Sequence, residues 1–230
     1  MKDIFGQALF GYFKGDGKHK LWINNTYGAK EEMPLDVYFR TEDEMPDLEL
    51  IAINKCRGKV LDIGAGAGSH ALILQGKGLD VTALDISDLA VTIMLQRGVK
   101  LAVAADVFTY QRDKYDTLLL MMNGIGLCGT IQQLRLFLQH AKTLLNKGGQ
   151  LIFDSSDIAY LYDGDVPVRD DYYGELSYQY VYKGQKNNWF KWLYIDAEKL
   201  KTIATEEGWV VEVLYEDDMD QYLARLIPLN

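Results

Sequence analysis

Three glycines and two aspartates in one short stretch have the types and spacing of a nucleoside-binding site. Gly64, Gly66 and Gly68 follow Asp62 at every second position. Without side chains they allow a tight turn and the close approach of a ligand to the backbone. Asp85 follows an apolar run, and a carboxylate there can accept hydrogen bonds from both hydroxyls of a ribose lying across the turn.

The spacing of the glycines helps to decide which ligand binds. A dinucleotide site has Gly-x-Gly-x-x-Gly, but here the third glycine comes one residue early and Ser69 stands at the diagnostic position. The carboxylate of Asp62 would repel the phosphates of a dinucleotide, whereas it suits the ammonium group of an amino-acid moiety. The pattern therefore disfavours a pyrophosphate ligand.

A strand, loop, helix and second strand must position these residues. The apolar pair Val60-Leu61 ends at Asp62, and Ser69 can cap a helix with an apolar face. The run Val81 to Leu84 then forms a strand that brings Asp85 to its carboxyl end. This is the opening unit of a nucleotide-binding α/β sheet.

The order acid, three glycines, helix, strand, acid resembles that of the class I S-adenosylmethionine-dependent methyltransferases. Asp62 and the three glycines match the first motif of that family, and Asp85 matches its ribose-binding acid. The resemblance extends from about Gly58 to Asp154. It implies an α/β, Rossmann-like fold whose seven-stranded, mostly parallel sheet has helices on both faces and an antiparallel last strand. It also implies S-adenosylmethionine as the cofactor and methyl transfer to an oxygen, nitrogen or carbon atom.

The resemblance assigns further cofactor contacts. Asp106 and Val107 match the pair that contacts adenine after the third strand, although an aspartate that starts a solvent turn is the alternative. Arg40 could grip the methionyl carboxylate with two parallel hydrogen bonds, or be a surface arginine in an acidic stretch. Tyr27 and Phe39 are candidates to close the site with Arg40. The complete predicted set of cofactor contacts is Asp62, Gly64, Ala65, Gly66, Gly68, Asp85, Ile86, Asp106, Val107, Asn123, Gly124 and Arg40.

Candidates for acid or base catalysis are fewer, because a base is needed only if the acceptor arrives protonated. Asp154, Tyr27 and Tyr160 are the candidates. Asn123 begins an Asn-Gly-Ile-Gly loop, unlike the Asn/Asp-Pro-Pro-Tyr/Phe of members that methylate bases or glutamine, so those acceptors lose support. His70 is expected to be a packing or solvent residue. His19 and His140 lie in a turn and on a helix with no acidic partner at ligand spacing, so no metal site is predicted.

The remaining segments are predicted to elaborate a single domain over residues 1–230. Residues 1–57 form a helical or lid elaboration before the cofactor-binding core, 58–154. An amphipathic helix is expected from Ile4 to Phe13, a connector or binding surface over 22–40, and a helix that Thr41 caps with Leu48, Ile51 and Ala52 buried. Residues 155–195 form an insertion with a hairpin of 177–182 and 189–195, which covers a substrate pocket, extends the sheet or builds a dimer surface. Residues 196–230 supply the last helix and closing strands.

Composition limits the possible partners and location. The net charge is −9 and no basic stripe is visible, which disfavours nucleic acid and favours a small-molecule acceptor, with a protein acceptor still open. No stretch is long enough to cross a bilayer, and two cysteines cannot build a disulfide framework, so a cytoplasmic location is expected. A cofactor-binding protein without activity and an NAD(P)-dependent oxidoreductase are the alternative functions. The sequence leaves the oligomeric state open.

Overall fold

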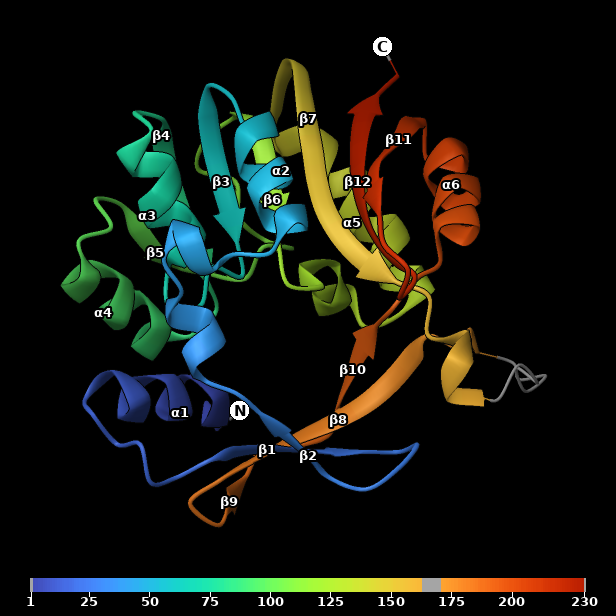
Figure 1. Ribbon diagram of the computed structural model, residues 1–230. Coiled ribbons are helices and arrows are strands. Elements are labelled where there is room, and N and C mark those ends of the chain that lie inside the picture. The colour runs from blue at the N-terminus through green and yellow to red at the C-terminus, as the bar shows by residue number, and fades with distance from the viewer. Residues whose placement is uncertain (1, 163–170, 230) are drawn as a thin grey trace.

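A seven-stranded sheet forms the centre of the computed structural model, which describes residues 2–162 and 171–229 (Figure 1). Its strand order is β11-β12-β7-β6-β3-β4-β5. The strands are β3 (Lys59–Ile63), β4 (Asp80–Asp85), β5 (Ala102–Ala104), β6 (Tyr115–Leu120), β7 (Leu145–Ser156), β11 (Trp209–Glu216) and β12 (Gln221–Pro228). The strands from β3 to β7 pair in parallel, and β12 lies antiparallel between β7 and β11.

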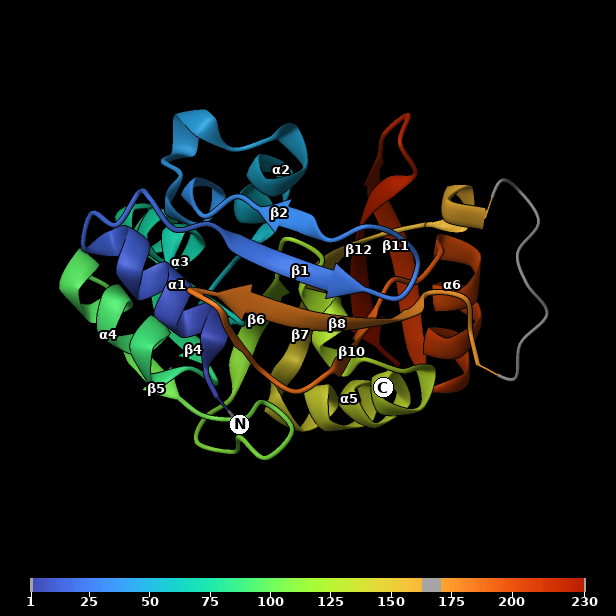
Figure 2. The same ribbon diagram turned by 90° about the horizontal axis from the view of Figure 1, so that it is seen from below.

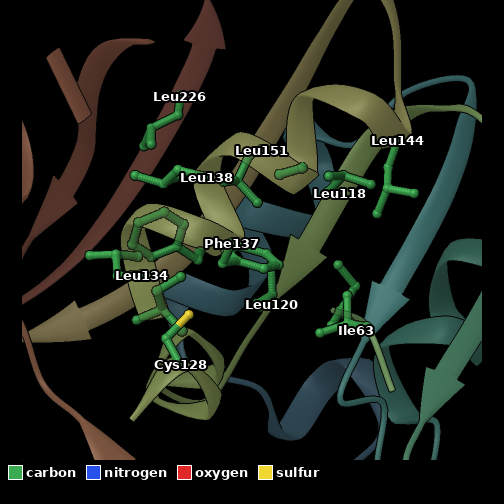
Figure 3. Close-up of a cluster of buried hydrophobic side chains, with 14 of the residues drawn as sticks. Ile63, Leu118, Leu120, Cys128, Leu134, Phe137, Leu138, Leu144, Leu151 and Leu226 are labelled. Atoms are coloured by element: carbon green, nitrogen blue, oxygen red, sulfur yellow. The ribbon is translucent and has the colours of Figure 1, made fainter. Parts of the chain in front are cut away.

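Helices cover both faces of this sheet. One face carries α2 (Asp47–Lys55), α3 (Ser69–Gly76) and α4 (Asp88–Arg97), and the other carries α5 (Ile131–Leu144) and α6 (Ala197–Glu206). Figure 3 shows Leu134, Phe137 and Leu138 of α5 packed against leucines of the strands. The predicted fold class is therefore confirmed. Among the described residues, no helix is long and apolar enough to span a membrane.

Helix ends follow the predicted signals in most places. Ser87 Oγ accepts a hydrogen bond from Ala90 N at 3.0 Å at the start of α4, and Gly98 ends that helix with φ 102°. The prediction that a helix starts directly after Thr41 is wrong. Thr41 and Glu44 do form a capping box, but it starts only a short 3₁₀ turn, η2 (Glu42–Glu44). Because Pro46 disfavours helical conformation in the residue before it, α2 begins afterwards, at Asp47.

A second sheet joins the N-terminal segment to the insertion. It contains β1 (Leu21–Asn25), β2 (Glu31–Met33), β8 (Glu175–Tyr182), β9 (Gln185–Lys186) and β10 (Phe190–Leu193) in the order β10-β8-β1-β2, with β9 on β8. The predicted hairpin is present as β8 paired with β10. It does not extend the main sheet, because the other edge of β8 pairs with β1, where Trp22 lies opposite Val181. The segment 22–40 is therefore more than a connector.

The second sheet lies across the carboxyl ends of the parallel strands. In Figure 1, β1 and β8 cross beneath the ends at which the arrows of β3 and β7 point, and in Figure 2, seen from below, they lie in front of β6 and β7. Helix α1 (Ile4–Phe13) packs beside them, with Ile4, Ala8 and Leu9 buried against residues that include Ile93 of α4 and Tyr182 of β8. We call α1 and the strands β1, β2, β8, β9 and β10 the cover. At Gly126 the cover comes so close that an added Cβ would lie 2.0 Å from Trp192 Nε1.

Candidate functional site

The glycine turn between β3 and α3 has the backbone that only glycine adopts easily. Gly64, Gly66 and Gly68 have φ values of 71°, 56° and 81°. The amides of Gly64 and Ala65 both donate to the carbonyl of Leu84, at 2.8 and 3.0 Å, which ties the turn to the end of β4. A Cβ added to Gly64 would meet no heavy atom within 4 Å. The turn therefore leaves open space above β3, where a ligand can approach the backbone.

Asp85 ends β4 beside this turn and is 8% exposed. Its Oδ2 accepts from Gly66 N and its Oδ1 from Ser87 N, both at 2.9 Å. A carboxylate has about four acceptor positions, so each oxygen can still accept another donor. Burial raises the pKa of Asp85 to about 6, against the effect of the two amides. Ile86, the next residue, is 75% exposed and offers an apolar surface at the same edge.

Asp62 is the penultimate residue of β3 and is almost fully buried. Burial raises its pKa to about 6, although the charge of His70 and a hydrogen bond from the Ala71 amide act against this shift. Its Oδ2 has no hydrogen-bond partner among the described residues. Because an unpaired buried carboxylate oxygen is costly, this arrangement fits a ligand that brings a cationic donor.

The residues before α2 close the turn from the other side. Tyr38, in the 3₁₀ turn η1 (Asp36–Phe39), lies 3.5 Å from where a Cβ on Gly66 would be, and its carbonyl accepts from Ser69 Oγ at 2.8 Å. The prediction named Phe39 instead. Phe39 packs against α1, with its ring centroid 5.0 Å from that of Tyr12, so it faces away from this contact. Tyr38 was not among the residues predicted to close the site.

The partly buried Arg40 and the buried Glu49 and His70 form an ion-pair network that the sequence did not predict. Glu49 Oε1 accepts from Arg40 Nη2, and His70 Nε2 lies 2.7 Å from Glu49 Oε2. Arg40 is thus no surface arginine, and a protein carboxylate already occupies part of its guanidinium. The pKa of His70 is raised: burial acts to lower it, but the bond to Glu49 and the nearby carboxylates of Asp62 and Asp154 outweigh burial.

The expectation that His70 only packs or faces solvent is corrected by this pairing. One signal was available in the sequence. Glu49 precedes Ala52 and Ile53 by three and four positions, which puts a charged residue on the buried stripe of α2. Ile51, which had been expected on that stripe, is only half-buried.

Asn123 and Asp154 bring together the ends of β6, β7 and β10. Met122 and Asn123 have positive φ values of 61° and 53°, and backbone strain of this kind is concentrated at functional sites. Asn123 N donates to Asp154 Oδ2 at 2.8 Å, and Asn123 Nδ2 donates to the carbonyl of Leu193 at 3.2 Å. Asp154 is 1% exposed, burial raises its pKa to about 6, and its Oδ1 has no partner in the described part of the chain.

The other predicted residues lie at the margins of this arrangement. Asp106 is exposed after β5 and accepts from Phe108 N at 3.0 Å, while Val107 beside it is buried. Gly124 starts the 3₁₀ turn η3 (Gly124–Cys128) directly after Asn123. Tyr27 lies between β1 and β2 and packs against residues of the cover, and Tyr160 is 65% exposed.

The comparisons with known proteins decide what kind of site this is. Residues 40–213 match the family model of a methyltransferase domain. A methyltransferase from Bacteroides fragilis, crystallised with S-adenosylhomocysteine, is 37% identical with a TM-score of 0.92 over 100% of this chain and 96% of its own. The chain belongs to the S-adenosylmethionine-dependent methyltransferases. The predicted family, activity and cofactor are confirmed.

More distant methyltransferases share the fold with this enzyme. A methyltransferase from Clostridium acetobutylicum is 13% identical, with a TM-score of 0.60 over 79% of this chain and 88% of its own. A sugar N-methyltransferase from a Streptoalloteichus species is 14% identical, with a TM-score of 0.58 over 90% of this chain and 97% of its own. A search of curated proteins with the sequence of this chain found no match.

The buried carboxyl groups of the methyltransferase predict an unusual pH dependence of its stability. Asp62, Asp85 and Asp154 have pKa values raised to about 6, so the folded state binds protons more tightly than the unfolded chain, whose aspartates titrate near pH ~3.9. Lowering the pH from ~7.5 to ~5.5 should therefore stabilise the ligand-free protein by about 1 to 2 kcal/mol. His70, whose pKa is also raised, acts in the same direction. Thermal unfolding followed by circular dichroism should show Tm rising by roughly 2 to 8 °C.

Acids with lowered pKa values do not disturb this test. Asp116 and Glu207 lose their contributions only below the ordinary range of carboxyl groups, outside the chosen window. The matched control is Asp154→Asn, which should reduce the rise in Tm. A Tm that stays level or falls over this window would contradict the assignment of three protonatable buried carboxyl groups.

Proposed function

We propose that the methyltransferase binds S-adenosylmethionine along the carboxyl ends of β3, β4 and β5 and methylates a small molecule enclosed by the cover. The observation that carries the proposal is the pair of unpartnered buried oxygens, Asp62 Oδ2 and Asp154 Oδ1, at the ends of β3 and β7. The cover lies across both ends (Figure 1). A covered site suits a small acceptor better than a nucleic acid, and the net charge of −9 acts in the same direction.

Each part of the cofactor has a proposed partner in this chain. Asp62 would hold the ammonium group, and Asp85 would accept from the ribose hydroxyls with its two free acceptor positions. Arg40 keeps unused guanidinium donors for the methionyl carboxylate, including a buried Nε without a partner among the described residues. The remaining proposed contacts are the glycine turn with Ala65, the adenine neighbours Ile86, Asp106 and Val107, and the loop start at Asn123 and Gly124.

For methyl transfer, the protein needs to position the acceptor and, where the acceptor arrives protonated, to take up its proton. When bound, the cofactor supplies a methyl group on a positively charged sulfur. The cover would exclude water and hold the acceptor beside the bound cofactor. Asp154 is the proposed base for an acceptor that arrives protonated. Tyr27 is less suited because burial raises the pKa of its phenol, and Tyr160 is less suited because it is mostly exposed.

We also propose that residues 1–230 act as one domain. The cover needs both 1–57 and 155–195, because β1 pairs with β8, while 58–154 and 196–230 build the main sheet beneath it. Cys56 and Cys128 are both free, which supports a reducing, cytoplasmic location.

The test is the fate of a labelled methyl group. The purified protein is incubated with S-adenosylmethionine labelled on the methyl group and with a cell extract separated into small-molecule, protein and nucleic-acid fractions. Label is expected in the small-molecule fraction only. Label in a macromolecular fraction would overturn the choice of acceptor. Tight binding of S-adenosylmethionine with no transfer to any fraction would favour a cofactor-binding protein without activity.

A further inference from the structure

Three tyrosines, one on a strand of the cover and two that follow its strands, lie with their hydroxyl groups in a row. The hydroxyl of Tyr178 lies 3.4 Å from that of Tyr27 and 3.3 Å from that of Tyr194. Tyr178 is on β8 and 7% exposed, while Tyr27 follows β1 and Tyr194 follows β10. We call Tyr27, Tyr178 and Tyr194 the tyrosine row. The row combines aromatic surface with hydroxyl groups and carries no formal charge at neutral pH.

Backbone contacts fix the end of this row beside Asp154. The residues on either side of Tyr194 are both tied to the neighbours of the carboxylate: Leu193 O accepts from Asn123 Nδ2 at 3.2 Å, and Ile195 N donates to Ser155 Oγ at 3.0 Å. Tyr194 therefore lies where β7 and β10 meet. The raised pKa of Tyr194 agrees with this position, since burial is its largest cause and the negative charge of Asp154 also contributes.

Asp154 has no cationic side chain of its own in the described part of the chain. Asn123 N and Gln221 Nε2 both donate to its Oδ2, and Oδ1 has no partner. The cation that lies near Asp154 is His70, but His70 is paired with Glu49. Arg40 is paired with Glu49 too. One oxygen of this buried carboxylate is thus left without a donor, and the backbone contacts on either side of Tyr194 bring the end of the tyrosine row to the same place. Aromatic faces attract cations, and a carboxylate forms its strongest hydrogen bonds with charged donors.

We propose that the methyl acceptor is a primary or secondary alkyl amine, which enters as an ammonium ion and is held by Asp154 Oδ1 and the rings of Tyr178 and Tyr194. This proposal rests on the proposed function, because it names the acceptor of the same site. An anionic acceptor would be repelled by Asp154, Asp62 and Glu49. A neutral alcohol would leave the charge of Asp154 unbalanced in a buried place.

The step balances with the groups present. A proton of the ammonium ion passes to the carboxylate of Asp154, which leaves a neutral amine with a lone pair. That lone pair forms the new nitrogen–carbon bond to the methyl group as the carbon–sulfur bond breaks and the sulfur keeps the electron pair. The positive charge thereby moves from sulfur to nitrogen, and Asp154 returns its proton to water when the product leaves.

The test compares three ligands of the same shape and different charge. Cyclohexylamine, cyclohexanol and cyclohexanecarboxylate are titrated calorimetrically into the full-length protein saturated with S-adenosylhomocysteine. The amine is expected to bind about tenfold or more tightly than the alcohol, and the carboxylate more weakly than either. Equal affinity for the amine and the alcohol would overturn the proposal.

Variants separate this proposal from the cofactor site. Asp154→Asn should remove the preference for the amine while binding of S-adenosylhomocysteine is retained. Tyr194→Phe should keep most of the affinity for the amine because the ring remains, whereas Tyr194→Leu should lose it. An amine preference that survives in both Asp154→Asn and Tyr194→Leu would show that these residues do not form the subsite. Failure of the wild-type protein to bind S-adenosylhomocysteine would instead count against the proposed cofactor site.

Discussion

Replacing Asp85 with alanine is expected to weaken the binding of S-adenosylmethionine by about a hundredfold or more. The carboxylate is buried at the end of β4, and each of its oxygens keeps an acceptor position for a ribose hydroxyl. Hydrogen bonds to a charged group contribute roughly 1.5 to 3 kcal/mol each, and about 1.4 kcal/mol corresponds to a tenfold change in affinity. Calorimetric titration of the wild-type protein and of Asp85→Ala measures the difference.

The control for this prediction is Asp88→Ala. Asp88 lies nearby in the first turn of α4, is exposed, and its side chain has no proposed cofactor contact. This variant should bind S-adenosylmethionine like the wild type. Asp85 also holds the glycine turn through Gly66 N, so both variants need melting curves to show that they fold. A folded Asp85→Ala protein with wild-type affinity would remove Asp85 from the cofactor site.

Replacing Glu49 with alanine is expected to lower the free energy of unfolding by about 3 to 5 kcal/mol. Glu49 is 4% exposed and pairs with both Arg40 and His70, so its loss leaves a buried and a partly buried cation without their partner. Breaking a buried pair from one side is costly because the remaining charge stays desolvated. Urea unfolding near neutral pH measures the loss. The loss should shrink at higher pH, because deprotonation of His70 removes one of the unpaired charges.

A surface ion pair supplies the comparison. Glu32 pairs with Lys20 on the cover, and the two side chains are 37% and 57% exposed. Glu32→Ala should cost no more than about 1 kcal/mol, since exposed pairs contribute little. If Glu49→Ala lowered the free energy of unfolding no more than Glu32→Ala, the idea that Arg40 and His70 are left as desolvated, unpaired charges would be wrong.

The sequence by itself determined the cofactor-binding half of this protein. A strand, a turn and a helix that are contiguous in the chain position Asp62, the three glycines and Asp85. Each of these elements can be predicted from the residue types within it. A glycine marks each positive φ of the turn, Ser87 caps α4 and Gly98 ends it. Because these signals are short-range, the main sheet and its family could be predicted without tertiary information.

Only the tertiary structure decided how the site is closed and what surrounds the acceptor. Trp22 pairs opposite Val181, and Glu49 binds His70 across two helices. Tyr194 comes to lie beside Asp154 only when β10 is placed against β7. The sequence indicated a hairpin at 177–182 and 189–195 and a charged residue on the buried face of α2, but neither pattern identifies the remote partner, β1 in the first case and His70 in the second. The bonds that join them exist only after the chain has folded.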